Sequence, residues 1–345
     1  MDDIHQPQLL ELGHDTGRGN LLGIQPWMTP EDYRRAATLF NKLAAYLKIA
    51  RRRGWLNART IVVWPEYLGT WLAVTGAGRA VVRARSLTGA MAALALHRPG
   101  GLLSALLKTR EKDRFAAAIF RARAGSIAQA YQAVFSQLAR TYRVTMVAGS
   151  TVLPAPHVEK GHVVAGNGPL YGVTAVFAPD GRAYPDLVRK AHPVGSELPF
   201  LTPAAVDSLP VFNTPAGRLG VLICADAWYP APYERMSAQG AELIAVPSYI
   251  ATPGAWRHPW RGYDGAPRPG DVDPEDIGRL TEEQAWHKYA LAGRITGSSA
   301  RAGINVFLAG KLWDLGGEGR SLMVTGEGGP VEADEDRSAL ITVWL

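Results

Sequence analysis

Three residues of the sequence have side chains suited to acyl-transfer chemistry, and each lies at or near the end of a run typical of a strand. Glu66 follows VVWP, Lys190 lies in DLVRKAHP, and Cys224 ends GVLIC. A cysteine between a strand and a helix lies near the positive end of the helix dipole, which favours the thiolate. Backbone N–H groups there, including that of Ala225, can stabilise a developing anion. A carboxylate can accept the thiol proton and later activate water, and a lysine can stabilise charge on a carbonyl oxygen or nitrile nitrogen.

Taken singly, each of the three residues also has a purely structural interpretation. A lone cysteine at the end of an apolar strand is commonly a buried small hydrophobic residue. A glutamate after a proline is commonly a solvated loop residue, and a lysine beside an arginine is commonly surface charge. The catalytic interpretation therefore requires the three side chains to meet in space, which residue types alone do not establish.

The elements that must position these residues alternate between strands and helices. Apolar runs predict the strands, a turn at Pro179–Gly181 predicts a hairpin, and Thr281 with Gln284 predicts a capping box that starts a helix. The strands are expected at residues 21–27, 60–67, 144–153, 220–224, 241–249, 304–310, 320–326 and 339–345. The helices are expected after Pro30, at 128–142, from about Tyr229, and from Thr281 to about Ala302. This alternation predicts one α/β domain over residues 1–345.

Two stretches depart from the alternation. Residues from about 76 to 125 are rich in Ala, Leu and Arg and predict an inserted group of helices. Residues from about 252 to 280 are rich in Pro, Gly, Trp and Arg and predict a long loop. Loops of that length are often functional, so we expect a lid or a pocket wall, in which Trp256, His258 and Trp260 either close the site or pack the loop's base.

The composition limits the class of protein. The chain has 345 residues, of which 47% are hydrophobic and 20% charged, which excludes a disordered, collagenous or coiled-coil chain. One cysteine excludes an internal disulfide framework and a Cys-rich zinc site. His157 and His162 have no third ligand nearby in sequence, so we predict no metal. The motifs of serine hydrolases, zinc proteases and nucleotide-binding loops are absent.

The basic charge is concentrated in the predicted insertion. The formal net charge is +6, yet residues 79–123 alone contain ten Lys or Arg and two Asp or Glu. The insertion is interpreted first as a cover over the pocket or a subunit contact, second as a peripheral membrane contact, and third as a nucleic-acid site. We predict no nucleic-acid partner, because the segment shows no recognised motif. The first twenty residues lack a basic start and an apolar run, so the chain is expected to be cytoplasmic.

At these motifs the sequence resembles the nitrilase superfamily, the carbon–nitrogen hydrolases. WPEYLG, RKAH and GVLICADAWYP occur in the order of that family's Glu–Lys–Cys signature. GIQ, VAGS, GAELIAVPS and GRSLMV also match, so the resemblance covers most of the chain. It implies a four-layer α-β-β-α sandwich, a homodimer or higher homo-oligomer, a small-molecule amide or nitrile as substrate, and no cofactor.

The resemblance also implies a role for each residue. Glu66 would be the general base, Lys190 the transition-state stabiliser and Cys224 the nucleophile that forms a thioester. Glu197, seven residues after the lysine, would orient Lys190 or the substrate amine, although a solvated glutamate is the alternative. The desolvated surroundings of Glu66 are expected to raise its pKa.

One departure from the family pattern concerns the substrate. Nitrile-hydrolysing members follow the cysteine with Trp-Glu, whereas Ala225 and Asp226 follow it here, which favours an amide or carbamoyl substrate. Nitrile hydrolysis and acyl transfer to an amine stay open as alternatives, as does a non-catalytic scaffold that binds a membrane or a partner. Substrate-binding positions are predicted at Ala225, Trp228, Tyr229 and Tyr249.

Overall fold

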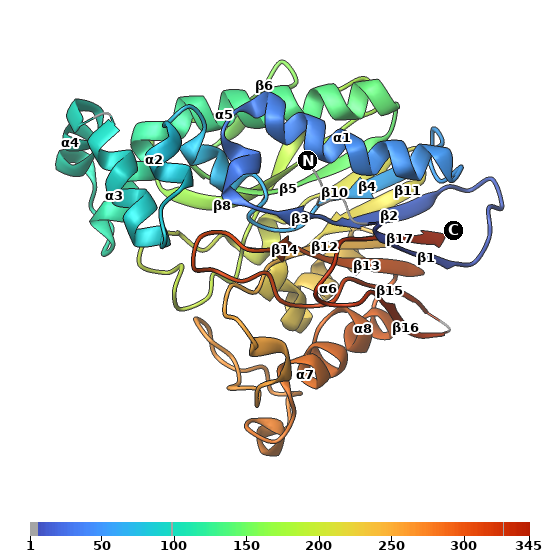
Figure 1. Cartoon of the computed structure of the whole chain (residues 1–345). Helices are drawn as coiled ribbons and strands as arrows, with labels where there is room; N and C mark the ends of the chain where they lie inside the picture. The colour runs from blue at the N-terminus through green and yellow to red at the C-terminus, as the bar shows by residue number, and fades with distance from the viewer. Residues whose placement is uncertain (1–5, 98, 327) are drawn as a thin grey trace.

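Two stacked β-sheets form the centre of the computed structural model (Figure 1). The structure describes residues 6–97, 99–326 and 328–345. Among these residues, one sheet has seven strands in the order β1-β17-β2-β4-β5-β8-β9, and the other has six in the order β10-β11-β12-β13-β15-β16. The strands of the first sheet are β1 (Gln8–Leu12), β17 (Ala339–Trp344), β2 (Asn20–Gln25), β4 (Thr60–Val63), β5 (Thr145–Pro154), β8 (Leu170–Phe177) and β9 (Ala183–Arg189). Those of the second are β10 (Val211–Thr214), β11 (Gly217–Val221), β12 (Leu243–Ser248), β13 (Ala302–Phe307), β15 (Leu322–Thr325) and β16 (Gly328–Glu332).

Helices cover the outer face of each sheet, which gives the expected order of layers (Figure 1). Helices α1 (Ala36–Arg52) and α5 (Arg114–Tyr142) lie on the seven-stranded sheet. Helices α6 (Pro230–Ala238), α7 (Glu282–Tyr289) and α8 (Leu291–Arg294) lie on the other side of the molecule, against the six-stranded sheet. The prediction of a four-layer α-β-β-α sandwich is confirmed.

The central strands are apolar on both faces because each face packs on a different layer. Along β4, Ile61 and Val63 face the other sheet, whereas Val62 faces α1 and α5. Such a strand shows a continuous apolar run instead of an alternation, as parallel strands covered on both sides do. This is why TIVV was recognisable in the sequence as a buried strand.

Strand directions bring two of the motif-bearing segments to one edge. Strands β4 and β5 are parallel, β5 and β8 antiparallel, and β8 and β9 antiparallel. Strands β4 and β9 therefore run in the same direction and end at the same edge of the sheet. Glu66 comes shortly after β4, and Lys190 comes directly after β9.

Gly149 fixes the loop that carries Glu66. It lies in β5 at φ +69°, where the register with β8 shifts between Val147 and Ser150. A Cβ at this position would lie 2.3 Å from the carbonyl oxygen of Pro65. Only glycine combines that backbone angle with so close an approach.

The inserted region differs from the expected boundaries. It contains α2 (Arg79–Val82), α3 (Leu87–His97) and α4 (Pro99–Lys108), but the stretch from Arg114 onward already belongs to α5. The prediction that a separate helix starts at Ala128 was therefore wrong. Asp113 caps α5 by accepting a hydrogen bond from the backbone N–H of Ala116, so the helix begins there. The first half of α5, before Ala128, was not recognised as part of this helix because that stretch is rich in Ala and Arg.

Further differences lie near the two ends of the chain. Strand β1 was not predicted and pairs in parallel with β17. The helix that starts at Thr281 has the predicted capping box with Gln284, but it ends at Tyr289 because Ala290 leaves the helical conformation. The remaining elements are short: β3 (Trp27–Met28), β14 (Ala309–Gly310), β6 (His157–Glu159), β7 (His162–Val164), η1 (Pro30–Tyr33), η2 (Thr70–Val74), η3 (Val206–Ser208), η4 (Cys224–Trp228), η5 (Ala255–Arg257), η6 (Pro274–Asp276) and η7 (Ile295–Gly297).

The long loop at residues 252–280 packs on the second sheet through its tryptophans. Trp256 is fully buried and Trp260 is 2% exposed, whereas His258 is exposed. Trp256 therefore packs the loop's base, whereas Trp260 also lines a cavity at Cys224.

No single helix in the described part of the chain is long and apolar enough to cross a membrane. Two consecutive segments, Leu87–His97 and Gly100–Lys108, reach that length and composition only together, and they are bent by 108°.

Candidate active site

The side chains of Cys224, Glu66, Glu197 and Lys190 line one cavity near the ends of strands from both sheets. Lys190 Nζ lies 2.7 Å from Glu66 Oε1 and 2.7 Å from Glu197 Oε2. The three side chains are buried, with 2% of Lys190, 2% of Glu66 and 4% of Glu197 exposed. Cys224 begins η4, its Sγ lies 3.9 Å from the carbonyl oxygen of Tyr249, and it lines the same cavity as the other three residues. The structure thus brings together four residues from three segments that are far apart in the sequence.

Glu197 is held in place by further hydrogen bonds. The Tyr67 hydroxyl donates to its Oε1 at 2.8 Å, and the backbone N–H of Val194 donates to its Oε2 at 2.9 Å. The carboxylate is therefore fixed against Lys190 and is not a solvated surface group. Tyr67 was not predicted as a site residue, although it directly follows Glu66.

Burial and neighbouring charge set the protonation of the site. Burial raises the pKa of Glu66 to about 7, partly offset by the charge of Lys190. Burial alone would lower the pKa of Lys190, but the carboxylates of Glu197 and Glu66 raise it well above its usual value. The ammonium therefore stays protonated, while Glu66 can change its charge near neutral pH.

The thiol differs from the sequence-based expectation. Burial raises the pKa of Cys224 well above its usual value, and the negative charge of Glu66 raises it further. The prediction of a thiolate favoured at rest was therefore wrong, because desolvation outweighs the charge of Lys190. The sulfur needs a base beside it that takes the proton as the new bond forms.

Two residues of the site have backbone angles that are rare for residues other than glycine. Cys224 has φ +50° and Tyr67 has φ +62°. Such left-handed conformations cost on the order of 1–3 kcal/mol and persist only where the surroundings enforce them. Both residues line the cavity that contains Glu66.

Asp226 connects the lysine segment to the cysteine segment, and sequence reasoning did not identify this role. Its Oδ1 accepts the backbone N–H groups of Ala191 and His192 at 3.0 and 2.7 Å, and its Oδ2 accepts that of Ile223 at 3.2 Å. The side chain is fully buried. In the sequence Asp226 stood out only as a departure from the family pattern after the cysteine, which bears on the substrate and does not reveal these hydrogen bonds.

The predicted substrate-binding residues lie together in a small chamber at the thiol. Its volume is about 210 Å³, and Cys224, Ala225, Trp228, Tyr229 and Tyr249 all line it. Tyr229 stacks on the ring of His192, with a centroid distance of 3.8 Å. The other lining residues of this aromatic chamber are Val194, Ile250, Trp260, Gly262, Tyr263, Asp264, Glu282 and Trp286.

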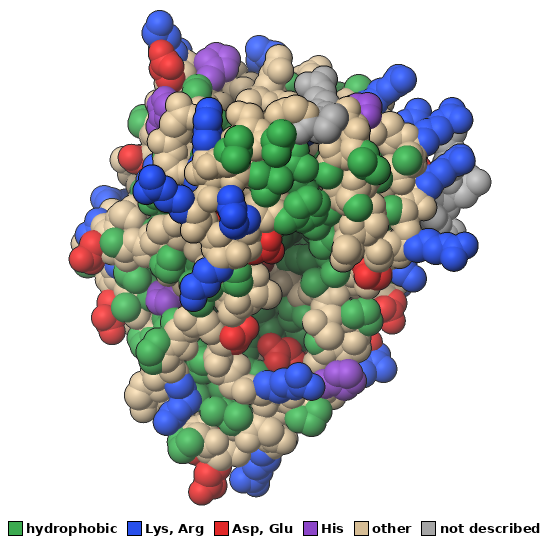
Figure 2. All heavy atoms as spheres, turned by 90° about the vertical axis from the view of Figure 1, so that its left-hand side faces the viewer, with side chains coloured by type: hydrophobic (Ala, Val, Ile, Leu, Met, Phe, Trp, Pro, Cys, Tyr) green, Lys and Arg blue, Asp and Glu red, His purple; other side chains and the backbone are tan. Residues whose placement is uncertain are grey.

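A second and larger chamber opens on the other side of the thiol. Its volume is about 540 Å³, and Glu66, Lys190, Glu197 and Cys224 form its polar end. Helix α3 of the inserted region lines the opposite end, which agrees with the interpretation of the insertion as a cover. Figure 2 shows this face, where hydrophobic side chains gather around a hollow.

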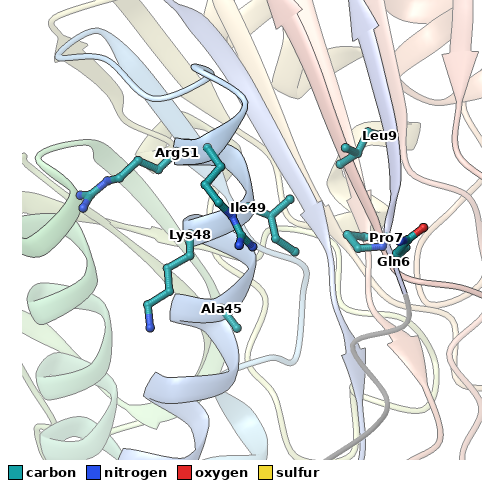
Figure 3. Close-up of a pocket in the computed structure, with 8 residues that line it drawn as sticks. Gln6, Pro7, Leu9, Ala45, Lys48, Ile49 and Arg51 are labelled. Carbon is teal, nitrogen blue, oxygen red and sulfur yellow. The ribbon is translucent and has the colours of Figure 1, made fainter.

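A third hollow is separate from this chemistry. It has a volume of about 680 Å³ and lies between β1 and α1 (Figure 3). Leu9 and Ile49 lie on its two sides, while Lys48 and Arg51 point away from it. It shares no lining residue with either chamber at Cys224.

In the described residues no cluster of three or more His, Cys, Asp or Glu side chains could hold a metal ion.

Comparison with known proteins decides the family. The family model described as carbon-nitrogen hydrolase matches residues 24–266, which include Glu66, Lys190 and Cys224. The chain belongs to the carbon-nitrogen hydrolase family. The resemblance predicted from the three motifs is thereby confirmed at the level of the family.

Solved structures of carbon-nitrogen hydrolases share the fold. The carbon-nitrogen hydrolase of Helicobacter pylori G27 is similar with a TM-score of 0.56 at 18% identity, over 94% of this chain and 88% of that one. An amidase from Nesterenkonia sp. AN1, with acrylamide added to its active-site cysteine, gives a TM-score of 0.52 at 15% identity, over 95% and 93%. At such identities the likeness shows the fold.

Curated relatives match over shorter stretches. The N-carbamoylputrescine amidase of Solanum lycopersicum is 30% identical over 113 residues, which are 29% of this chain and 37% of the relative. The deaminated glutathione amidase of Yersinia enterocolitica is 45% identical over 42 residues, 12% of this chain and 15% of the relative. The chain therefore spans well under half of either relative.

Proposed function

We propose that the chain hydrolyses a non-peptide carbon–nitrogen bond in an amide or carbamoyl substrate, through a thioester on Cys224. The observation that carries this proposal is the buried lysine held at 2.7 Å by each of two carboxylates, in a cavity that the only thiol of the chain also lines. A structural ion pair has no need of a cavity or a nucleophile at its side. Here both are present, with perturbed pKa values, as is typical of a catalytic site.

The first half-reaction forms the thioester. Cys224 Sγ bonds to the carbonyl carbon while Glu66 accepts the thiol proton, and the carbonyl electron pair moves to oxygen. The Lys190 ammonium and the backbone N–H of Ala225 would stabilise that oxyanion. The carbon–nitrogen bond then breaks, and the nitrogen takes the proton from Glu66 and leaves as ammonia or an amine.

The second half-reaction returns the enzyme to its first state. Glu66 accepts a proton from water as the water oxygen bonds to the thioester carbon. The carbon–sulfur bond breaks, and the sulfur regains the proton from Glu66. The balance is one amide and one water consumed, with one carboxylic acid and one amine or ammonia formed. A Glu66 pKa of about 7 suits a group that both accepts and donates a proton.

Two features favour an amide or carbamoyl substrate over a nitrile. Ala225 stands where the nitrile-hydrolysing members have tryptophan, and Asp226 is committed to three backbone N–H groups. The curated relatives with matching stretches are named as amidases, which supports the same choice. Nitrile hydrolysis and acyl transfer to an amine use the same residues and are alternatives to be tested.

The deciding experiment measures ammonia release from a panel of amides, ureido acids and nitriles. We expect release from members of the first two groups, and none from the same protein with Cys224→Ala. Added amines that divert the product from acid to a new amide would show acyl transfer instead. Absence of turnover together with slow alkylation of Cys224 would favour the non-catalytic scaffold.

Several properties stay predictions at this stage. They are the homodimer or higher homo-oligomer and the cytoplasmic location, together with the less favoured alternative of a peripheral membrane contact by the insertion. Sedimentation equilibrium of the full chain tests the first, and cosedimentation with anionic vesicles tests the last.

A further inference from the structure

We propose that the larger chamber at Cys224 binds an unbranched aliphatic acyl chain, so that the substrate is a fatty amide rather than a small polar one. This inference rests on the proposed function and specifies its substrate class. It concerns the chamber that the inserted helix α3 completes.

The chamber has one charged end and a wall that is mostly apolar, with the hydroxyl-bearing residues Tyr67, Thr70, Ser196, Tyr249 and Thr252 also among its lining. Among the described residues that line it, charged groups other than Glu66, Lys190 and Glu197 are limited to Asp113, which is engaged as the cap of α5. The apolar wall includes Trp71, Val74, Met91, Leu94, Ile119 and Phe120. A substrate tail in this space would find few hydrogen-bonding partners, which favours a hydrocarbon.

The dimensions suit a tail longer than a methyl group. The volume of about 540 Å³ lies within the range of about 300–1,000 Å³ that is usual for ligand cavities. An acetyl group would leave most of that apolar surface in contact with water. A longer chain would remove the water and gain the transfer free energy of each methylene.

The two chambers differ in a way that assigns the acyl chain to the larger one. The aromatic chamber carries the carboxylates of Asp264 and Glu282 among its rings, and burial raises the pKa of Glu282 to about 7. Carboxylates and aromatic faces suit an amine, whereas a hydrocarbon tail gains more from the largely apolar wall of the larger chamber. The apolar chamber contains Lys190 at its polar end, where the carbonyl oxygen and later the product carboxylate would lie.

Helix α3 of the inserted region contributes part of the chamber's apolar wall. Ala90 and Leu94 of α3 are buried, at 1% and 7% exposed, and face the chamber together with Met91. Ala92, on the same helix, is exposed and does not line it. Helix α3 therefore presents one face to the chamber and another to solvent, which provides a matched pair of positions for mutation.

The first experiment compares straight-chain primary amides from acetamide to hexanamide by ammonia release. Each buried methylene is expected to raise kcat/KM about fourfold, so hexanamide should exceed acetamide on the order of 200-fold. Met91→Glu, which places a charge in the chamber, should lower the hexanamide-to-acetamide ratio at least tenfold. Ala92→Glu adds the same charge on the solvent face and should leave the ratio unchanged.

Two further arms keep the test decisive. If Met91→Glu does not fold, Leu94→Phe replaces it and should shift the preferred chain to a shorter one by filling the far end. Calorimetric titration of the Cys224→Ala protein measures binding without turnover and should show hexanamide binding more tightly than acetamide.

The outcomes separate this inference from the proposed function. Hydrolysis of acetamide with no gain along the series would overturn the acyl-chain inference and leave the hydrolase proposal intact. No hydrolysis of any amide, ureido acid or nitrile would refute the hydrolase proposal. In that case the titration decides the chamber's preference, and equal affinity for the two amides would overturn it.

Discussion

Replacing Glu197 by glutamine tests how charge is distributed around Lys190. The substitution keeps the shape of the side chain and removes one negative charge. The amide oxygen can still accept from Lys190 and from the Val194 N–H, and the amide N–H can donate to the hydroxyl oxygen of Tyr67. The expected effect is therefore electrostatic, with the positions of the groups retained.

The size of the effect follows from two distances. Lys190 Nζ lies 2.7 Å from an oxygen of Glu66 and 2.7 Å from an oxygen of Glu197, so those oxygens are at most about 5.4 Å apart. At an effective dielectric constant of about 20, two charges at that separation repel by about 3 kcal/mol. Since one pKa unit corresponds to about 1.4 kcal/mol, the loss of this repulsion should lower the pKa of Glu66 by about two units.

The assay is kcat/KM for a hydrolysed amide as a function of pH. In the unaltered protein the acid limb should have its midpoint at about pH 7, because protonated Glu66 cannot accept the thiol proton. In Glu197→Gln the limb should move to lower pH by about two units. As a control, Asp186→Asn removes an exposed charge on β9, the strand that precedes Lys190, and should leave the limb in place. An acid limb that stays or moves to higher pH in Glu197→Gln would refute the reasoning.

Three further predictions concern Glu66, Asp226 and Gly149. Glu66→Gln should abolish the burst of amine release as well as steady turnover in stopped-flow assays, and a normal burst would show that another base serves the first step. Asp226→Ala should lower the free energy of unfolding in urea by about 3–5 kcal/mol, because three backbone N–H groups lose their acceptor. A loss below about 1 kcal/mol would show that these hydrogen bonds do not stabilise the fold. Gly149→Ala should destabilise the fold by about 2–3 kcal/mol more than Gly54→Ala, which has a similar φ and open space around it. Equal losses in urea titrations of these two glycine variants would show that the contact with Pro65 is unimportant.

Most of the central architecture was predictable because buried strands have a strong local pattern. The runs around Ile61 and Val221 are apolar on both faces, and they stand before the residues that end in the cavity. The order of the three motifs then indicated the family. Local sequence therefore determined both the strands and the positions at which the site residues leave them.

What was missed depends on contacts between distant segments. Strand β1 has a weak pattern of its own and exists because β17 offers it a parallel edge. The start of α5 depends on the cap at Asp113, and the surrounding Ala and Arg residues gave no contrast between its faces. The hydrogen bonds of Asp226 to Ala191 and His192 join residues 34 or 35 positions apart, which no local pattern reveals.

The thiol is a case in which the local argument pointed in the wrong direction. The start of a helical turn stabilises a thiolate, but the free energy of desolvation depends on everything that covers the sulfur. Cys224 is 8% exposed and lies beside Glu66, so its pKa rises. The same burial raises the pKa of Glu66 to about 7 and makes it a base at neutral pH.

The covalent intermediate is the most direct test of the central claim. The protein is mixed with a hydrolysed amide, quenched in acid within the first turnovers, and its intact and peptide masses are measured. We predict a mass increase equal to the acyl group, located on the peptide that contains Cys224 and absent from Cys224→Ala. Hydrolysis by Cys224→Ala at the rate of the unaltered protein would contradict the mechanism.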